Sequence, residues 1–129
     1  MKKYKGRLPI KWRAFFSQYK GDQMNFFNLF VRKDINEGIE RYLKEENAVL
    51  LDVRTNEEYA AGHIEGSINL PIGEIDRAGT VITDKDVPIY VYCRSGKRSE
   101  RAAAYLKGNG YTKVNDIGGI LSYNGTLVK

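Results

Sequence analysis

The chain has 129 residues, of which 42% are hydrophobic and 29% charged, the length and composition of one ordinary globular domain. One cysteine excludes an internal disulfide and any multi-cysteine metal site, and no apolar run approaches the roughly 18 residues of a membrane span. The net charge of +5 would suit nucleic acid, but residues 1–23 carry seven of the 21 positive and one of the 16 negative groups. The remaining residues carry a net charge of −1, so we expect no nucleic-acid partner. The lack of a long apolar run predicts no transmembrane segment.

Charge and apolar patterning predict three segments: a basic leader (1–23), an apolar arm (24–33) and a folded domain (34–129). The leader lacks the apolar core of a signal peptide. One interpretation is an amphipathic helix, with weak contact between residues 1–31 and an anionic membrane surface. Its apolar residues stand at helical spacing: Leu8, Trp12, Phe15, Phe16 and Tyr19.

The leader has a second interpretation, as upstream sequence that is translated although Met24 is the native start. Residues 20–24, KGDQM, can be encoded with a purine-rich GGAG shortly before ATG, which resembles a bacterial ribosome-binding site. The next segment, MNFFNLFV at 24–31, is strongly apolar. We expect it to pack against the domain, and a dimer contact or a membrane-surface anchor are the alternatives.

Strand and helix patterns alternate from residue 34 onward. Asp34 is an expected N-cap for a helix that runs to about Glu46, and the apolar run AVLLDV at 48–53 predicts a buried strand. The sequence TNEE at 55–58 matches a capping box, so a short helix is expected to begin there and to stop near Gly62.

The second half of the domain continues the alternation. Residues 67–70 and 88–92 predict strands, and a short helix or loop is expected between them at 72–86. A helix over 99–109 and a last strand at 113–117 complete the pattern. This order predicts an α/β fold with a parallel or mostly parallel sheet covered on both faces.

The polar loop CRSGKRS at 93–99 carries the chemistry, because it follows a strand and precedes a helix, where α/β sheets bind ligands. Backbone amides of such a loop and the helix N-terminus bind anions. Arg94, Lys97 and Arg98 add three positive charges, and Gly96 lets the backbone curl. We therefore predict an anion-binding site here.

Cys93 is the predicted nucleophile of this loop. Thiolate is the reactive form, and cysteines at helix N-termini beside cations have pKa values of about 3.5–7.5 instead of about 8.5. A neighbouring histidine base is then unnecessary, which suits a chain with one histidine. The alternative is a buried structural cysteine, but the six polar or small residues after Cys93 favour the nucleophile.

Three ordered motifs resemble those of the single-domain rhodanese-like family. The first comprises LLDVR, EY and GHIEGSINLP within 50–71, the second is VYCRSGKRS at 91–99, and the third is YTKVNDIGGI at 111–120. The resemblance covers about residues 34–123. It implies that 34–129 is a rhodanese-like domain with a central parallel five-stranded sheet and helices on both faces.

The resemblance also implies a thiosulfate sulfurtransferase activity. In the family, the loop thiolate takes a sulfane sulfur from a small anionic donor, carries it as a cysteine persulfide and yields it to a thiol or to cyanide. Here Cys93 would be the nucleophile and persulfide carrier. With no second cysteine, the acceptor, a small thiol or a protein, must come from outside, and no cofactor or metal is expected. Donor binding would fall to five loop residues: Arg94, Ser95, Gly96, Lys97 and Arg98.

Loop length distinguishes sulfurtransferases from family relatives with other activities. Phosphatase and arsenate-reductase relatives have Cys-x5-Arg, whereas Arg98 makes this loop Cys-x4-Arg, which resembles the sulfurtransferases. The alternatives are a non-catalytic module whose loop binds an anion or a partner, and then a cysteine-based phosphatase or arsenate reductase.

Other polar residues receive structural interpretations. His63 lacks metal-ligating partners and is expected to be structural. Asp52 and Arg54 are expected to form a structural ion pair with Glu58, with shaping of the pocket as the alternative. The free thiol of Cys93 suits a reducing compartment and so a cytoplasmic location.

Overall fold

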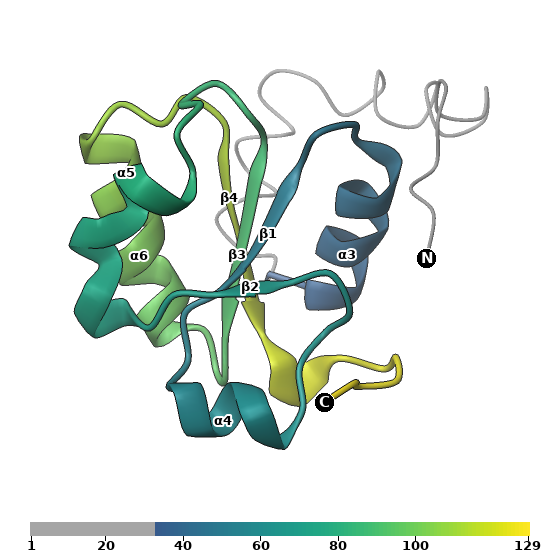
Figure 1. The fold of residues 1–129 in the computed structure, drawn as a ribbon. Coiled ribbons are helices and arrows are strands. Elements are labelled where there is room, and N and C mark those ends of the chain that lie inside the picture. The colour runs from purple at the N-terminus through teal and green to yellow at the C-terminus, as the bar shows by residue number, and fades with distance from the viewer. Residues whose placement is uncertain (1–32) are drawn as a thin grey trace, which may run out of the picture.

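The computed structural model describes residues 33–129, and within them four strands form one parallel sheet (Figure 1). The strands lie in the order β2-β1-β3-β4, so β1 and β3 are central. Their bounds are Val49–Asp52 for β1, Ile68–Asn69 for β2, Ile89–Cys93 for β3 and Val114–Gly119 for β4.

Helices connect these strands and cover both faces of the sheet. Figure 1 shows α3 on one side and α5 and α6 on the other, with α4 at the end where β1 and β3 finish. The α-helices are α3 (Ile35–Lys44), α4 (Asn56–Ala61), α5 (Ala78–Val81) and α6 (Lys97–Gly108). Two 3₁₀ helices, η1 (Ile72–Arg77) and η2 (Ile120–Ser122), complete the described chain.

The central strand β3 organises the core, because all five of its residues are buried. Successive side chains of a strand point to opposite faces of the sheet. Val91 and Cys93 therefore pack in the cluster that includes residues of α5 and α6. Tyr90 and Tyr92 pack in the cluster that includes residues of α3. The same alternation thus assigns the Cys93 side chain to the α6 side of the sheet.

Local signals in the sequence set the helix ends on the amino-terminal side of the site. Asp34 caps α3 and accepts the Asn36 N–H at 2.9 Å. Thr55 and Glu58 form the predicted capping box of α4: Thr55 Oγ1 accepts the Glu58 N–H at 3.1 Å, and Glu58 Oε1 accepts the Thr55 N–H at 3.0 Å. Gly62 ends α4, as predicted.

Two expectations differ from the structure. The α/β fold is confirmed, but the implied fifth strand is not found among residues 33–129, where the chain after β4 forms η2 and one antiparallel bridge between His63 and Val128. The last long helix begins at Lys97 instead of Ser99, because Gly96 completes the turn early. The interpretations of the leader and of the arm up to residue 32 fall outside the described chain.

No helix within residues 33–129 combines the length and apolarity that crossing a membrane requires.

Candidate active site

The loop between β3 and α6 wraps around one sulfur atom. Cys93 ends β3, and Gly96 adopts a φ of 110°, in the left-handed region that favours glycine. The loop therefore curls back, and the Gly96 N–H donates a hydrogen bond to Cys93 Sγ at 3.0 Å. The sulfur lies beside the N-terminus of the 12-residue helix α6, where amides and the helix dipole favour negative charge.

The end of β4 supports the backbone of this loop. A Cβ on Gly119 would lie 2.4 Å from the carbonyl oxygen of Arg94 and 2.7 Å from the Cα of Ser95. The Leu121 N–H donates to the same Arg94 carbonyl at 3.2 Å. Only a glycine permits this approach, so β4 and η2 hold the first half of the loop in place.

Cys93 is almost fully enclosed, with 1% of its surface exposed. Burial alone would suit the structural alternative, but a structural thiol needs no amide donor aimed at its sulfur. Ser99, also fully buried, places Oγ 3.6 Å from Cys93 Sγ. The sulfur thus has two hydrogen-bonding neighbours, the Gly96 N–H and the Ser99 hydroxyl, and the Cys93 side chain packs in the apolar cluster that includes residues of α6.

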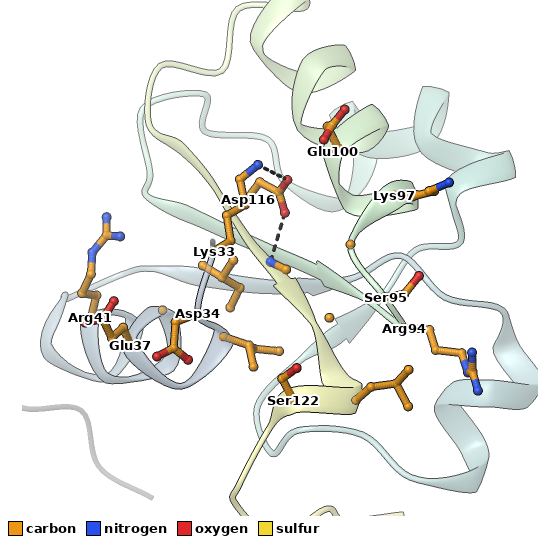
Figure 2. A pocket seen from close by; sticks show the side chains of 17 residues that line it. Lys33, Asp34, Glu37, Arg41, Arg94, Ser95, Lys97, Glu100, Asp116 and Ser122 are labelled. Atoms are coloured by element: carbon orange, nitrogen blue, oxygen red, sulfur yellow. Dashed lines mark hydrogen bonds and ion pairs between the residues drawn. The ribbon is translucent and has the colours of Figure 1, made fainter. Parts of the chain in front are cut away.

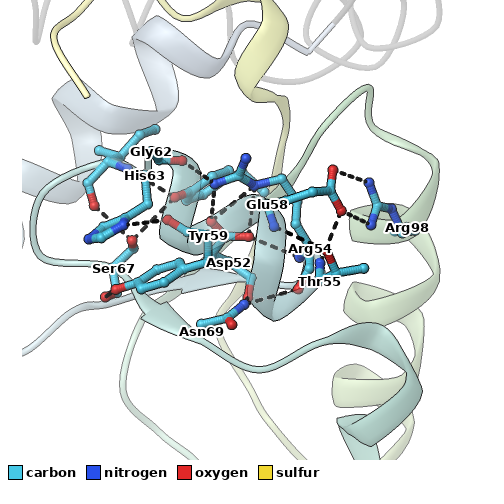
Figure 3. Close-up of polar contacts among 12 residues, drawn as sticks. Asp52, Arg54, Thr55, Glu58, Tyr59, Gly62, His63, Ser67, Asn69 and Arg98 are labelled. Atoms are coloured by element: carbon cyan, nitrogen blue, oxygen red, sulfur yellow. Dashed lines mark hydrogen bonds and ion pairs between the residues drawn. The ribbon is translucent and has the colours of Figure 1, made fainter. Parts of the chain in front are cut away.

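The three cations of the loop have different surroundings. Arg94 and Lys97 are exposed, whereas Arg98 is half-buried. Arg98 reaches α4 and makes a two-pronged ion pair with Glu58, with Nη1–Oε1 at 2.7 Å and Nη2–Oε2 at 3.1 Å (Figure 3). Its charge is therefore already balanced inside the protein. The predicted attraction of an anionic donor consequently depends on Arg94 and Lys97.

The Glu58–Arg98 pair is strong for a partly exposed contact. Hydrogen bonds from Arg98, helped by those from Thr55 in the capping box, lower the pKa of Glu58 to about 2. The same pairing raises the pKa of the Arg98 guanidinium. Glu58 is therefore ionised at neutral pH and ties the first turn of α4 to the first turn of α6.

The prediction that Arg54 pairs with Glu58 is wrong. Arg54 instead binds Asp52, with Nη2–Oδ2 at 2.7 Å, and donates to the Gly62 carbonyl at 2.8 Å (Figure 3). A local turn explains the choice: the Arg54 N–H bonds to Asp52 Oδ1 at 2.9 Å, which brings the two side chains together. Both residues are buried, so this pair is structural, and it fixes the end of α4.

A cavity of about 820 Å³ opens on the β4 side of the loop (Figure 2). Four of the five predicted donor-binding residues line it, with Arg94 and Lys97 on one side and Arg41 of α3 on the other. Cys93 and Arg98 are not among the lining residues. The cavity wall therefore does not include the sulfur, and two of its lining residues, Lys33 and Asp116, form an ion pair at 3.2 Å.

His63 packs against α4 through contacts that involve no charged side chain. Its ring stacks on Tyr59 with centroids 3.7 Å apart, and Nδ1 lies 2.9 Å from the Tyr59 carbonyl oxygen. Over residues 33–129 no group of three or more His, Cys, Asp or Glu side chains is placed to hold a metal ion.

The sequence reasoning missed two contacts of the site. It treated Ser99 only as a helix residue and Arg98 only as a donor-binding cation. A serine three residues after a loop glycine is a signal for a hydroxyl that bonds back to the glycine carbonyl, as Ser99 does to Gly96 at 3.0 Å. The Arg98–Glu58 pair joins residues 40 positions apart, and no local pattern could have indicated it.

Comparison with known proteins decides the family. The sequence pattern of the Rhodanese-like domain matches residues 36–125. The chain belongs to the rhodanese-like domain family. The match covers all four strands and the whole Cys93 loop, so the site described above is the loop of a rhodanese-like domain.

Curated relatives match the rhodanese-like part of the chain. Thiosulfate sulfurtransferase PspE of Escherichia coli is 39% identical over 71 residues, which are 54% of this chain and 68% of PspE. YrkF of Bacillus subtilis is 39% identical over 82 residues, 63% of this chain but only 44% of YrkF. The chain thus matches less than half of that larger relative.

Solved rhodanese structures share the fold. A rhodanese with anions from E. coli superimposes with a TM-score of 0.60 at 36% identity, covering 64% of this chain and 98% of the other. The human single-domain sulfurtransferase TSTD1 gives a TM-score of 0.58 at 27% identity, covering 67% and 88% of the two chains.

Proposed function

We propose that the protein is a sulfurtransferase in which Cys93 carries a sulfane sulfur as a persulfide. The observation that supports this most is the 3.0 Å hydrogen bond from the Gly96 N–H to Cys93 Sγ at the N-terminus of α6. An amide aimed at a sulfur stabilises its thiolate, which is the nucleophile and also the leaving group of sulfur transfer. Relatives that include a thiosulfate sulfurtransferase support sulfur transfer in general.

The first half-reaction loads the enzyme from a small anionic donor such as thiosulfate. The Cys93 thiolate attacks the outer sulfur of the donor and forms the Sγ–S bond. The sulfur–sulfur bond of the donor breaks, and sulfite leaves with its electron pair. Arg94 and Lys97, both exposed beside the loop, would attract the donor and its anionic product.

The second half-reaction needs an acceptor from outside the chain, because Cys93 is the only cysteine. The thiolate of a small molecule or a protein, or cyanide in an assay, attacks the outer sulfur of the persulfide. The Sγ–S bond breaks and its electron pair returns to Cys93. This cycle needs no metal or cofactor, but it needs a reducing compartment such as the cytoplasm to keep the thiol free.

The rate of thiocyanate formation from thiosulfate and cyanide tests the activity. We expect the wild-type protein to form thiocyanate and Cys93→Ser to form none, while circular dichroism and thermal unfolding of the variant stay close to wild type. The substitution keeps nearly the same shape at a buried position, so the fold should survive. Transfer retained by Cys93→Ser would contradict the proposal.

Assays on the same two proteins, wild type and Cys93→Ser, distinguish sulfur transfer from the alternative functions. A non-catalytic module would form no thiocyanate in either protein. A cysteine-based phosphatase would hydrolyse an aryl phosphate, which we expect this protein to leave intact because its Cys-x4-Arg loop is one residue shorter than the phosphatase loop.

A further inference from the structure

Ser99 is the second polar neighbour of the reactive sulfur. It lies in the first turn of α6 with none of its surface exposed. Its Oγ stands 3.6 Å from Cys93 Sγ and donates to the Gly96 carbonyl at 3.0 Å. Helix packing therefore holds one hydroxyl between the sulfur and the loop backbone.

The direction of these hydrogen bonds must depend on the charge of the sulfur. A serine hydroxyl has one proton to donate and can accept two hydrogen bonds. When Cys93 is a thiol, its S–H donates to Ser99 Oγ, and the hydroxyl proton is free to bond the Gly96 carbonyl. A thiolate has no proton, so only a hydroxyl that turns toward Sγ keeps this contact favourable.

The hydrogen bond that turning breaks is the one to the Gly96 carbonyl at 3.0 Å, because the Gly118 carbonyl oxygen lies 3.5 Å from Ser99 Oγ, at the limit of hydrogen-bond distance. The Gly96 carbonyl oxygen also accepts the Glu100 N–H at 3.1 Å, so it remains hydrogen-bonded when Ser99 turns away. A buried acceptor that lost its only partner would oppose the change. The loop therefore permits the hydroxyl to switch between two acceptors.

We propose that Ser99 is a catalytic residue whose hydroxyl reverses its hydrogen bond and donates to the Cys93 thiolate. The inference rests on the proposed sulfur transfer and adds a residue to it. Together with the Gly96 N–H, Ser99 gives the thiolate two donors inside an apolar cluster. No proton is transferred, because the hydroxyl only changes its acceptor.

The two half-reactions should respond differently to this donor. During loading, negative charge leaves Sγ for the departing sulfite, so a donor to Sγ does not assist the ionised thiolate. During release, the acceptor thiolate attacks the outer sulfur, the Sγ–S bond breaks and the charge returns to Sγ. Ser99 stabilises that developing charge and therefore accelerates release rather than loading.

Single-turnover kinetics of Ser99→Ala tests this difference. Loading by thiosulfate is followed by mass spectrometry at a pH where alkylation of Cys93 has reached its plateau, and release is then started with a thiol or cyanide. We expect release to slow roughly tenfold or more, the effect of losing a hydrogen bond to a charged group, while loading is unchanged or faster. Equal slowing of both steps, or no slowing of release, would overturn the proposal.

A second measurement does not depend on sulfur transfer. The rate of Cys93 alkylation by iodoacetamide is recorded against pH for the wild-type protein and for Ser99→Ala. Loss of a thiolate donor should move the midpoint of the profile to higher pH. An unchanged midpoint would contradict the role of Ser99. If alkylation shifts but thiosulfate loads no sulfur on the wild type, then the proposed sulfur transfer fails and the hydrogen bond stands.

Two controls separate this role from a structural one. Ser67 is another buried serine, which donates to the Ile64 carbonyl at 2.7 Å and accepts from Tyr92 Oη at 3.2 Å, so Ser67→Ala also removes a buried hydroxyl. It should leave the ratio of loading to release unchanged. If Ser99→Ala does not fold, Ser99→Thr and Ser99→Val share one shape, and only the threonine variant should retain fast release.

Discussion

Cys93, the proposed nucleophile, is enclosed yet has two hydrogen-bonding neighbours, the Gly96 N–H and the Ser99 hydroxyl. An isolated buried anion is costly, whereas an anion with fixed donors replaces its lost water. The Gly96 N–H supplies one such donor from the loop, and the proposed turn of the Ser99 hydroxyl supplies a second from α6. The enclosure therefore strengthens the effect of each donor, because both act in surroundings of low polarity.

Charge at Glu58 gives a stability prediction with a defined pH window. Because pairing with Arg98 lowers its pKa from 4.5 to about 2, ionised Glu58 stabilises the folded state above pH 4.5, and this stabilisation is lost as the pH falls toward 2. Glu58→Gln should be about 1 kcal/mol less stable at pH 7, and the two unfolding curves should converge near pH 2.

The matched control for that prediction is Glu57→Gln. Glu57 lies in the same first turn of α4 and is exposed, so the variant removes the same charge without breaking the pair. Urea unfolding between pH 2 and 7 compares the variants. A difference between Glu58→Gln and wild type that did not shrink toward low pH would contradict the assignment.

At the scale of elements, arginine side chains bind both ends of α4. Its first turn holds Arg98 through Glu58, and its last residue is followed by Gly62, whose carbonyl accepts from Arg54. Arg54 in turn is paired with Asp52 at the end of β1. The short helix thus connects the ends of β1 and α6 through two ion pairs.

Replacing Arg54 tests how much the buried ion pair between Arg54 and Asp52 stabilises the fold. Arg54→Met leaves the fully buried Asp52 carboxylate without its cation, so we expect a loss of about 3–5 kcal/mol in the free energy of unfolding. Arg77→Met is the control, because Arg77 pairs with Glu74 on the surface with 62% of its side chain exposed. That variant should lose less than about 1 kcal/mol. If urea unfolding showed the same loss of stability for both variants, the buried ion pair would stabilise the fold no more than the surface pair does.

The contact between β4 and the loop gives another prediction. Gly119→Ala would put a Cβ 2.4 Å from the Arg94 carbonyl oxygen, so the loop must move. A displacement of about 1 Å can reduce the rate of an enzyme about a hundredfold, and we expect a loss of that order in sulfur transfer. Gly73→Ala has no atom within 4 Å of the new Cβ and should change nothing. Activity of Gly119→Ala equal to that of Gly73→Ala would refute the close approach.

At the scale of the molecule, three strands bring their carboxyl ends to one edge. Asp52 ends β1, Cys93 ends β3 and Gly119 ends β4, and these strands are neighbours in the sheet. Parallel strands necessarily place such ends together, which is why ligand sites of open α/β sheets gather there. The position of the Cys93 loop is therefore a consequence of topology.

Much of this topology was predictable from local patterns. Apolar runs indicated β1 and β3 because buried parallel strands are apolar on both faces, and the capping box at 55–58 set the start of α4. The loop chemistry followed from CRSGKRS between a strand and a helix. These features depend on neighbours in the chain and can be read from sequence.

What could not be predicted depends on distant residues. The choice of Arg98 as the partner of Glu58 is decided by how α4 and α6 approach each other, not by spacing. The near-complete enclosure of Cys93 likewise arises from packing between β3 and α6. Local patterns identify which groups are chemically able to act, whereas tertiary packing decides which of them face the sulfur.

The most direct test of the central claim is peptide mass spectrometry after treatment with thiosulfate. We predict that the peptide containing Cys93 gains the mass of one sulfur atom, that a thiol or cyanide removes it, and that Cys93→Ser never gains it. A wild-type protein that stays unmodified on Cys93, or a sulfur that is retained in the presence of thiols and cyanide, would contradict the account.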